Sequence, residues 1–165
     1  MEFGLFLIRV VVGLTLAAHG AQKLFGMFGG HGIAGTGQFF ESIGFRPGRV
    51  MAAIAGSGEL GGGLALAFGL LTPFASAVII ATMAVAIWSV HIEKGFFNQS
   101  GGFEYPLTIT AIALGIAFIG AGPLSLDAML GLQLAGREWG FVALGLGLAG
   151  ALPPLVARAA AIRHA

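Results

Sequence analysis

The sequence predicts an all-α integral membrane protein, a helical bundle with four core transmembrane helices and a short fifth helix at the C-terminus. Hydrophobic residues make up 57% of the 165 residues and charged residues only 9%, whereas a soluble domain typically has about 25% charged residues. The mean hydropathy is +0.95. The apolar residues are gathered in stretches of roughly 20, which is the length of a helix that crosses a bilayer.

The charge and cysteine content argue against several classes of function. A formal net charge of +1, without a basic stripe, argues against nucleic-acid binding. The chain contains no cysteine. It therefore offers no thiol redox chemistry, no disulfide, and no thiolate ligand for zinc or an iron–sulfur cluster.

The first half of the chain contains two predicted spans joined by a long loop. Residues 3–25 and 50–71 are apolar stretches of spanning length. The glycine-rich segment 26–48 joins them, and we expect a short interfacial helix over 37–43 because its apolar residues share one face. Thr72-Pro73 predicts a tight turn after the second span, since proline fixes its own φ and restricts the residue before it.

The second half continues with a third span, a loop and a fourth span. Residues 74–92 and 105–121 are the apolar stretches, and 93–104 is the polar loop between them. Gly122-Pro123 predicts the end of the fourth span, because proline has no N–H to donate inside a helix and its ring clashes with the preceding turn.

The C-terminal region is open to two interpretations. Its apolar stretch, 141–156, is shorter than a full span and ends in Pro153-Pro154, although Trp139 is a suitable interfacial anchor. We expect a short fifth helix here; the alternative is a tail packed on the surface of a four-helix bundle. The predicted division is a four-helix membrane domain over 1–130 and a C-terminal extension with a short basic tail over 131–165.

The distribution of lysine and arginine predicts an orientation if five helices cross the membrane. Loops one and three and the C-terminus then share a side that holds most of the Lys and Arg residues, which favours the cytoplasm for that side. With four spans the C-terminal arginines change sides and the bias disappears.

Three ionisable residues in the first predicted span lie on one helical face. Arg9 and His19 are each about 40° from Lys23 on a helical wheel. Charges that face lipid cost several kcal/mol, so this stripe should face the bundle interior. Glu59, near the middle of the antiparallel second span, supplies the counter-charge at a depth between Arg9 and His19, so that either cation could reach it. We predict a pair between Glu59 and Arg9, with His19 nearby.

This interior cluster has two interpretations. A buried ion pair can simply fix the register of two helices, since desolvation consumes much of its Coulomb energy. Alternatively, Arg9, His19, Lys23 and Glu59 form a polar pocket that binds a quinone head group, a proton or a small anion. Lys23, near the end of its span, could also extend to the interface.

A second cluster is predicted at one membrane face, where His91 ends the third span and Glu104 and Tyr105 open the fourth. Glu104 could serve only as a favourable charge at a helix N-terminus. If loops one and three lie on the same side, the two clusters could line one continuous cavity. No closely spaced pair such as His-x-x-x-His is present, so we predict no metal site.

Six short motifs, taken in order, resemble the DoxX family over about residues 3–130. They are Arg9-x-x-x-Gly13, His19-Gly20-x-x-Lys23-Leu24, Glu59-x-x-Gly62-Gly63, Gly69-x-x-Thr72-Pro73, Gly102-x-Glu104-Tyr105-Pro106-Leu107 and Gly122-Pro123-Leu124-Ser125-Leu126-Asp127. The ionisable motif positions are Arg9, His19, Lys23, Glu59, Glu104 and Asp127. The resemblance implies a small bacterial or archaeal membrane protein, usually with four spans.

The resemblance also implies a function. A similar subunit belongs to a thiosulfate:quinone oxidoreductase, and other relatives are linked to a membrane assembly with a superoxide dismutase and a sulfurtransferase. We therefore expect a quinone-associated subunit of an oxidoreductase complex in the bacterial inner membrane, an accessory subunit rather than a stand-alone enzyme. The chain encodes no cofactor of its own, and quinone is the candidate ligand. Other subunits or self-association are expected partners. The alternatives are a small transporter or channel, and a scaffold that anchors soluble redox enzymes.

Overall fold

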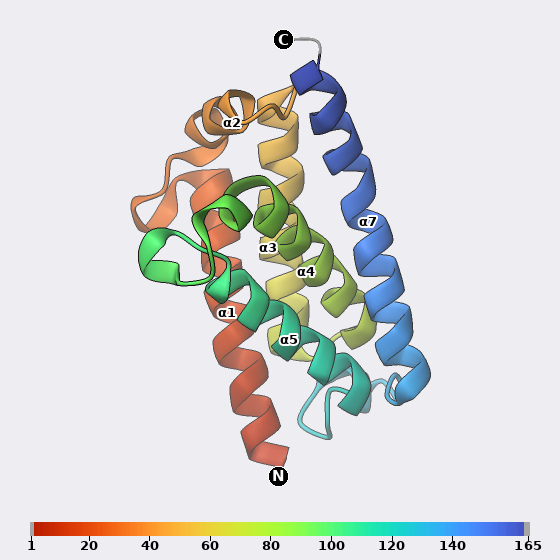
Figure 1. Cartoon of the computed structure of the whole chain (residues 1–165). Coiled ribbons are helices and arrows are strands. Elements are labelled where there is room, and N and C mark those ends of the chain that lie inside the picture. Colours follow the sequence, from red (N-terminus) through yellow and green to blue (C-terminus); the bar gives the residue numbers. More distant parts are fainter. Residues whose placement is uncertain (1, 164–165) are drawn as a thin grey trace.

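The computed structural model describes residues 2–163, and within this range the chain is helical with no β-strand. The main helices are α1 (Glu2–Phe25), α2 (Gly32–Ser42), α3 (Gly48–Phe68), α4 (Thr72–Ala86), α5 (Glu104–Ile119), α6 (Leu126–Met129) and α7 (Arg137–Arg163). Short turns of helix lie between them: η1 (Met27–Gly29), the π-helical η2 (Ile87–His91), η3 (Ile92–Lys94) and η4 (Asn98–Ser100). Figure 1 shows α2 and the end of α7 at one end of the bundle and the start of α1 at the other.

Within residues 2–163, four helical segments are long and apolar enough to cross a membrane: Glu2–Phe25, Gly48–Phe68, Thr72–Lys94 and Arg137–Arg163. The predicted class, an all-α membrane bundle, is confirmed. The sequence predicted that the C-terminal helix would be the short one. In the structure α5, with 16 residues, is the short apolar helix, and the C-terminal helix α7, with 27 residues, is the longest.

Helix α7 extends well beyond the apolar stretch 141–156 on both sides, and Pro153 and Pro154 do not end it. Proline inside a helix removes a hydrogen bond and costs about 3 kcal/mol, so packing must compensate. Ala143 is fully buried with Ile80 and Ala117 in a small core cluster. The expected alternative, a tail lying on the bundle surface, is therefore wrong: α7 packs along α4 and α5 as part of the bundle.

Helices α1 and α3 lie antiparallel with their backbones in contact. A Cβ atom added to Gly13 would lie 2.5 Å from the carbonyl oxygen of Gly63, and one added to Gly20 would lie 2.6 Å from that of Gly56. Small residues allow membrane helices to approach this closely. The glycines of the second span thus pack within the chain, and they fix which residues of α1 and α3 lie at the same depth.

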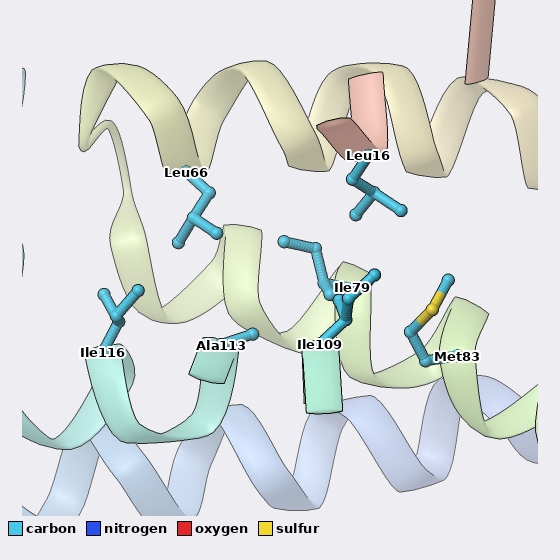
Figure 2. Close-up of a cluster of buried hydrophobic side chains, with 7 residues drawn as sticks. All are labelled: Leu16, Leu66, Ile79, Met83, Ile109, Ala113 and Ile116. Carbon is cyan, nitrogen blue, oxygen red and sulfur yellow. The ribbon is translucent and has the colours of Figure 1, made fainter. Parts of the chain in front are cut away.

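Apolar side chains from four helices fill the centre of the bundle. Figure 2 shows this cluster, in which α1 and α3 meet α4 and α5. Its buried members are Leu16, Leu66, Ile79, Met83, Ile109, Ala113 and Ile116. The cluster holds these four helices together. It lies beside the polar residues of α1 and α3.

The turn between α3 and α4 falls earlier than predicted. Gly69 and Leu71 carry the left-handed conformations, with φ of 63° and 47°, whereas Thr72 and Pro73 already belong to α4. Proline is well accommodated in the first turn of a helix, where its missing N–H has no intrahelical partner to lose. The interfacial helix is also longer than predicted, since α2 begins at Gly32 rather than at residue 37.

The α1–α3 contact yields a stability prediction with a matched control in the same helix. We expect Gly63→Leu to lower the melting temperature of the detergent-solubilised protein by several degrees or to abolish folding, since the side chain would strike the α1 backbone. Gly61→Leu should leave it nearly unchanged, because no atom lies within 4 Å of a Cβ at Gly61. Equal effects of the two substitutions on the melting curve would contradict the assigned register.

Candidate functional site

A cavity of about 370 Å³ lies between α1, α2, α3, α4, the η2 turn, the start of α5 and the middle of α7. Its volume falls within the range of small-molecule sites, roughly 300–1,000 Å³. Most of its wall is apolar, and α2 contributes Phe39 and Phe40. Its polar side chains are few: His19, Lys23, Glu59, Thr82, Ser89, His91 and Tyr105.

The ammonium group of Lys23 donates to the carboxylate of Glu59, and this is the only ion pair within the part of the chain that the structure describes. The Glu59 side chain is 6% exposed and that of Lys23 is 25% exposed. Removing two charges from water is expensive, so a pair of this kind persists only because the partners neutralise each other. Lys23 reaches into the bundle here rather than outward to the membrane interface.

Arg9 does not join this pair, and the predicted Arg9–Glu59 pair is wrong. Gly20 packs against Gly56 and Leu60, so Glu59 lies at the depth of His19. Arg9 is ten residues earlier on α1, which is about 15 Å along the helix axis. The helical wheel correctly placed Arg9 in the interior, since it is fully buried, but a wheel does not give depth.

Arg9 instead joins α1 to the loop that precedes α6. Its guanidinium donates to the carbonyl oxygen of Leu124 and packs against Gly69, where any Cβ would overlap it. Asp127 provides an opposite charge nearby. Arg9 therefore does not line the cavity, and it connects α1 with the α3–α4 turn and the α6 loop.

Asp127 caps the start of α4. Its carboxylate accepts hydrogen bonds from the backbone N–H groups of Leu71 (2.7 Å) and Thr72 (3.0 Å) and from the Thr72 hydroxyl (2.6 Å). The Asp127 N–H in turn donates to the carbonyl oxygen of Gly69 at 2.8 Å. A carboxylate at a helix N-terminus satisfies free N–H groups and interacts favourably with the helix dipole. This motif position has a structural role in the fold.

His19 lies in the cavity wall with one ring nitrogen engaged. Its Nδ1 is 2.9 Å from the carbonyl oxygen of Thr15. Because a carbonyl oxygen can only accept, Nδ1 carries the proton and Nε2 is left for another partner. The ring also packs against Tyr105, with 5.7 Å between the ring centroids. His19 and Tyr105 thus bring a free ring nitrogen and a phenol to the same wall.

His91 reaches the cavity from the π-helical turn η2, and its Nδ1 is 2.6 Å from the carbonyl oxygen of Gly101. Like His19, His91 therefore carries a proton on Nδ1. Ser89, in the same turn, has a buried hydroxyl without a hydrogen-bond partner. π-Helical turns inside α-helices often occur at functional sites. Sequence analysis missed Ser89, and its only signal was a hydroxyl inside an apolar span.

Glu104 does not line the cavity with its neighbour Tyr105. It is the first residue of α5, and its carboxylate accepts a hydrogen bond from the Asn98 N–H at 3.0 Å. This position orders loop three and suits a negative charge at a helix N-terminus. Among residues 2–163 no three His, Asp or Glu side chains are placed to hold one metal ion.

Fold and cavity together define a multi-pass helical membrane protein with a ligand-sized internal site. The sequence pattern of the DoxX family matches residues 4–92. The chain is 36% identical over 126 residues to the "Putative oxidoreductase CatD" of Bacillus subtilis, covering 76% of this chain and 86% of that protein. It is 31% identical over 127 residues to an uncharacterised protein of Haemophilus influenzae, covering 73% and 85%. No solved structure matches significantly. The chain belongs to the DoxX family.

The capping role of Asp127 predicts a graded loss of stability. Asp127→Ala should lower the free energy of unfolding by about 2–4 kcal/mol, because it leaves donors of Leu71 and Thr72 unsatisfied at about 1–3 kcal/mol each. Asp127→Asn, which keeps an acceptor oxygen, should lose less. Thermal unfolding in detergent measures both, with the exposed Glu138→Ala as control. A melting temperature of Asp127→Ala equal to that of the control would contradict the capping role.

Proposed function

We propose that this protein is a membrane subunit of an oxidoreductase complex and that its cavity holds the head group of a quinone. The observation that carries the proposal is the cavity itself: a largely apolar wall around a neutralised ion pair and several hydrogen-bonding side chains. Apolar pockets with a few placed polar groups are typical of cofactor sites. The name of the Bacillus subtilis relative, an oxidoreductase, agrees with this proposal.

The polar side chains suit the chemistry of a quinone ring. A quinone carries two carbonyl oxygens that accept hydrogen bonds, and it takes up two electrons and two protons when reduced. Lys23 and Tyr105 carry donors at the cavity wall, and His19 can donate through Nε2 when its ring is protonated. Glu59 and Lys23, as a hydrogen-bonded pair, can share and relay a proton.

We propose that a partner subunit supplies the electrons that reduce the quinone. The chain has no cysteine, so it offers no thiolate ligand for an iron–sulfur cluster. An accessory role in a complex therefore fits these residues better than a stand-alone enzyme. A location in the bacterial inner membrane is part of this proposal, and the bacterial sources of the named relatives support it. Self-association remains part of the same proposal.

A binding experiment with paired histidine variants tests the site. A short-chain quinone should bind the purified protein in lipid nanodiscs, and His19→Phe should weaken this binding about tenfold, the effect of losing about 1.4 kcal/mol of hydrogen bonding. Phenylalanine keeps an aromatic ring against Tyr105. His31→Phe, which changes an exposed histidine outside the cavity, should leave the affinity unchanged.

Two results would overturn the proposal. One is a wild-type protein with no measurable affinity for any short-chain quinone by calorimetry or thermal shift. The other is an equal loss of affinity in the His19 and His31 variants, which would place the binding elsewhere on the protein.

A further inference from the structure

A second cavity, of about 460 Å³, lies at the end of the bundle where α2, the η2–η3 turns and the last turns of α7 meet. We call it the basic groove. Its charged side chains are three cations and two carboxylates: Arg46, Lys94, Arg158, Glu41 and Glu93. It shares Phe39, Ile43, Ser89 and Val90 with the first cavity but none of that cavity's charged residues. It is therefore a distinct site.

Arg158 is held in place within the groove. Its Nε donates to the carbonyl oxygen of Ile43 at 2.8 Å, and its guanidinium lies 5.8 Å from the centre of the Phe45 ring. The Ile43 bond uses one of five guanidinium donors, so the terminal N–H groups are left for another acceptor. A fixed guanidinium with free terminal donors matches the geometry of an oxyanion such as phosphate.

The cations of the basic groove form no ion pair within the described residues. No carboxylate of residues 2–163 lies within 4 Å of Arg46, Lys94 or Arg158. The Glu41 carboxylate accepts the Gly48 N–H at 3.1 Å, which holds it beside that backbone group. Three cations against two carboxylates give the groove a net charge of +1, which favours an anion.

The surroundings of the groove indicate which anion it meets. It lies at the end of the bundle shared by α2 and the end of α7 (Figure 1), where lipid head groups surround spanning helices. Ile162, which lines the groove beside Arg158, is 51% exposed. This exposed apolar side chain next to a cation provides a surface for an acyl chain. A free phosphate ion would make no use of that surface.

We propose that the basic groove binds the phosphate of an anionic phospholipid through Arg46, Lys94 and Arg158. Basic pockets between membrane helices are suited to such head groups. The bound lipid would join α2, the η2–η3 turns and the end of α7, which enclose the groove. This site is independent of the proposed quinone site and makes a separate prediction.

Lipid binding to the full-length protein in mild detergent tests the proposal by native mass spectrometry. The probes are phosphatidylglycerol, zwitterionic phosphatidylcholine and inorganic phosphate. We expect phosphatidylglycerol to bind at least tenfold more tightly than phosphatidylcholine, and inorganic phosphate to compete only at millimolar concentration. Arg46→Gln with Lys94→Gln should weaken phosphatidylglycerol binding at least fivefold. This variant leaves Arg158 and its contacts with Ile43 and Phe45 intact, so folding should be preserved.

Two further variants make the test specific. Arg49→Gln with Arg163→Gln removes the same charge at the same end of the bundle but outside the groove lining, and should change the affinity less than twofold. Glu93→Gln should strengthen binding, because it removes a negative charge from the groove. Equal binding of the two lipids, equal losses in the two double variants, or tight binding of inorganic phosphate alone would each overturn the proposal.

Discussion

The ion pair between Lys23 and Glu59 is the interaction on which the interior of this protein depends. A charged side chain at membrane depth costs several kcal/mol unless it is paired or hydrated. The pair lets two such charges lie beside a largely apolar cavity, because each neutralises the other. Without Lys23, the Glu59 side chain, 6% exposed, would have no ion-pair partner among the described residues. The polar side of the cavity therefore depends on this single contact.

The position of the ion pair follows from backbone contacts rather than from side-chain chemistry. Gly13, Gly20 and Gly63 let α1 and α3 touch along their length, and this contact sets which residues share a depth. At the far end of α1, Arg9 bonds to the loop before α6, while Asp127 caps α4. These contacts tie α1, α3 and α4 together at the end of the bundle that carries the α3–α4 turn. The cavity lies between those helices near the end that carries α2.

Much of the fold could be predicted from the sequence, whereas the pairing of charges could not. Composition and apolar periodicity predict the helices, and the energetic cost of charge in lipid predicts that Arg9 and Glu59 face the interior. A helical wheel gives direction but not depth, so the partner of Glu59 depended on a register that only packing sets. Propensity also overstated the effect of Pro153 and Pro154, because α7 buries one face, from Gly140 to Ala151, against the bundle. His91 entered the cavity through a π-helical turn, which has no clear sequence signal.

A double-mutant cycle across the ion pair tests the central claim most directly. Lys23→Met is expected to lower the free energy of unfolding in mixed micelles by about 3–5 kcal/mol, since it leaves the buried Glu59 carboxylate alone. Glu59→Met should cost less, because the Lys23 side chain is 25% exposed and its ammonium group can extend toward the membrane interface. The double variant should recover most of that loss, because an apolar pair of similar volume replaces the ion pair without its desolvation cost. Additive losses, with no recovery in the double variant, would contradict the claim that mutual neutralisation of Lys23 and Glu59 sustains the interior.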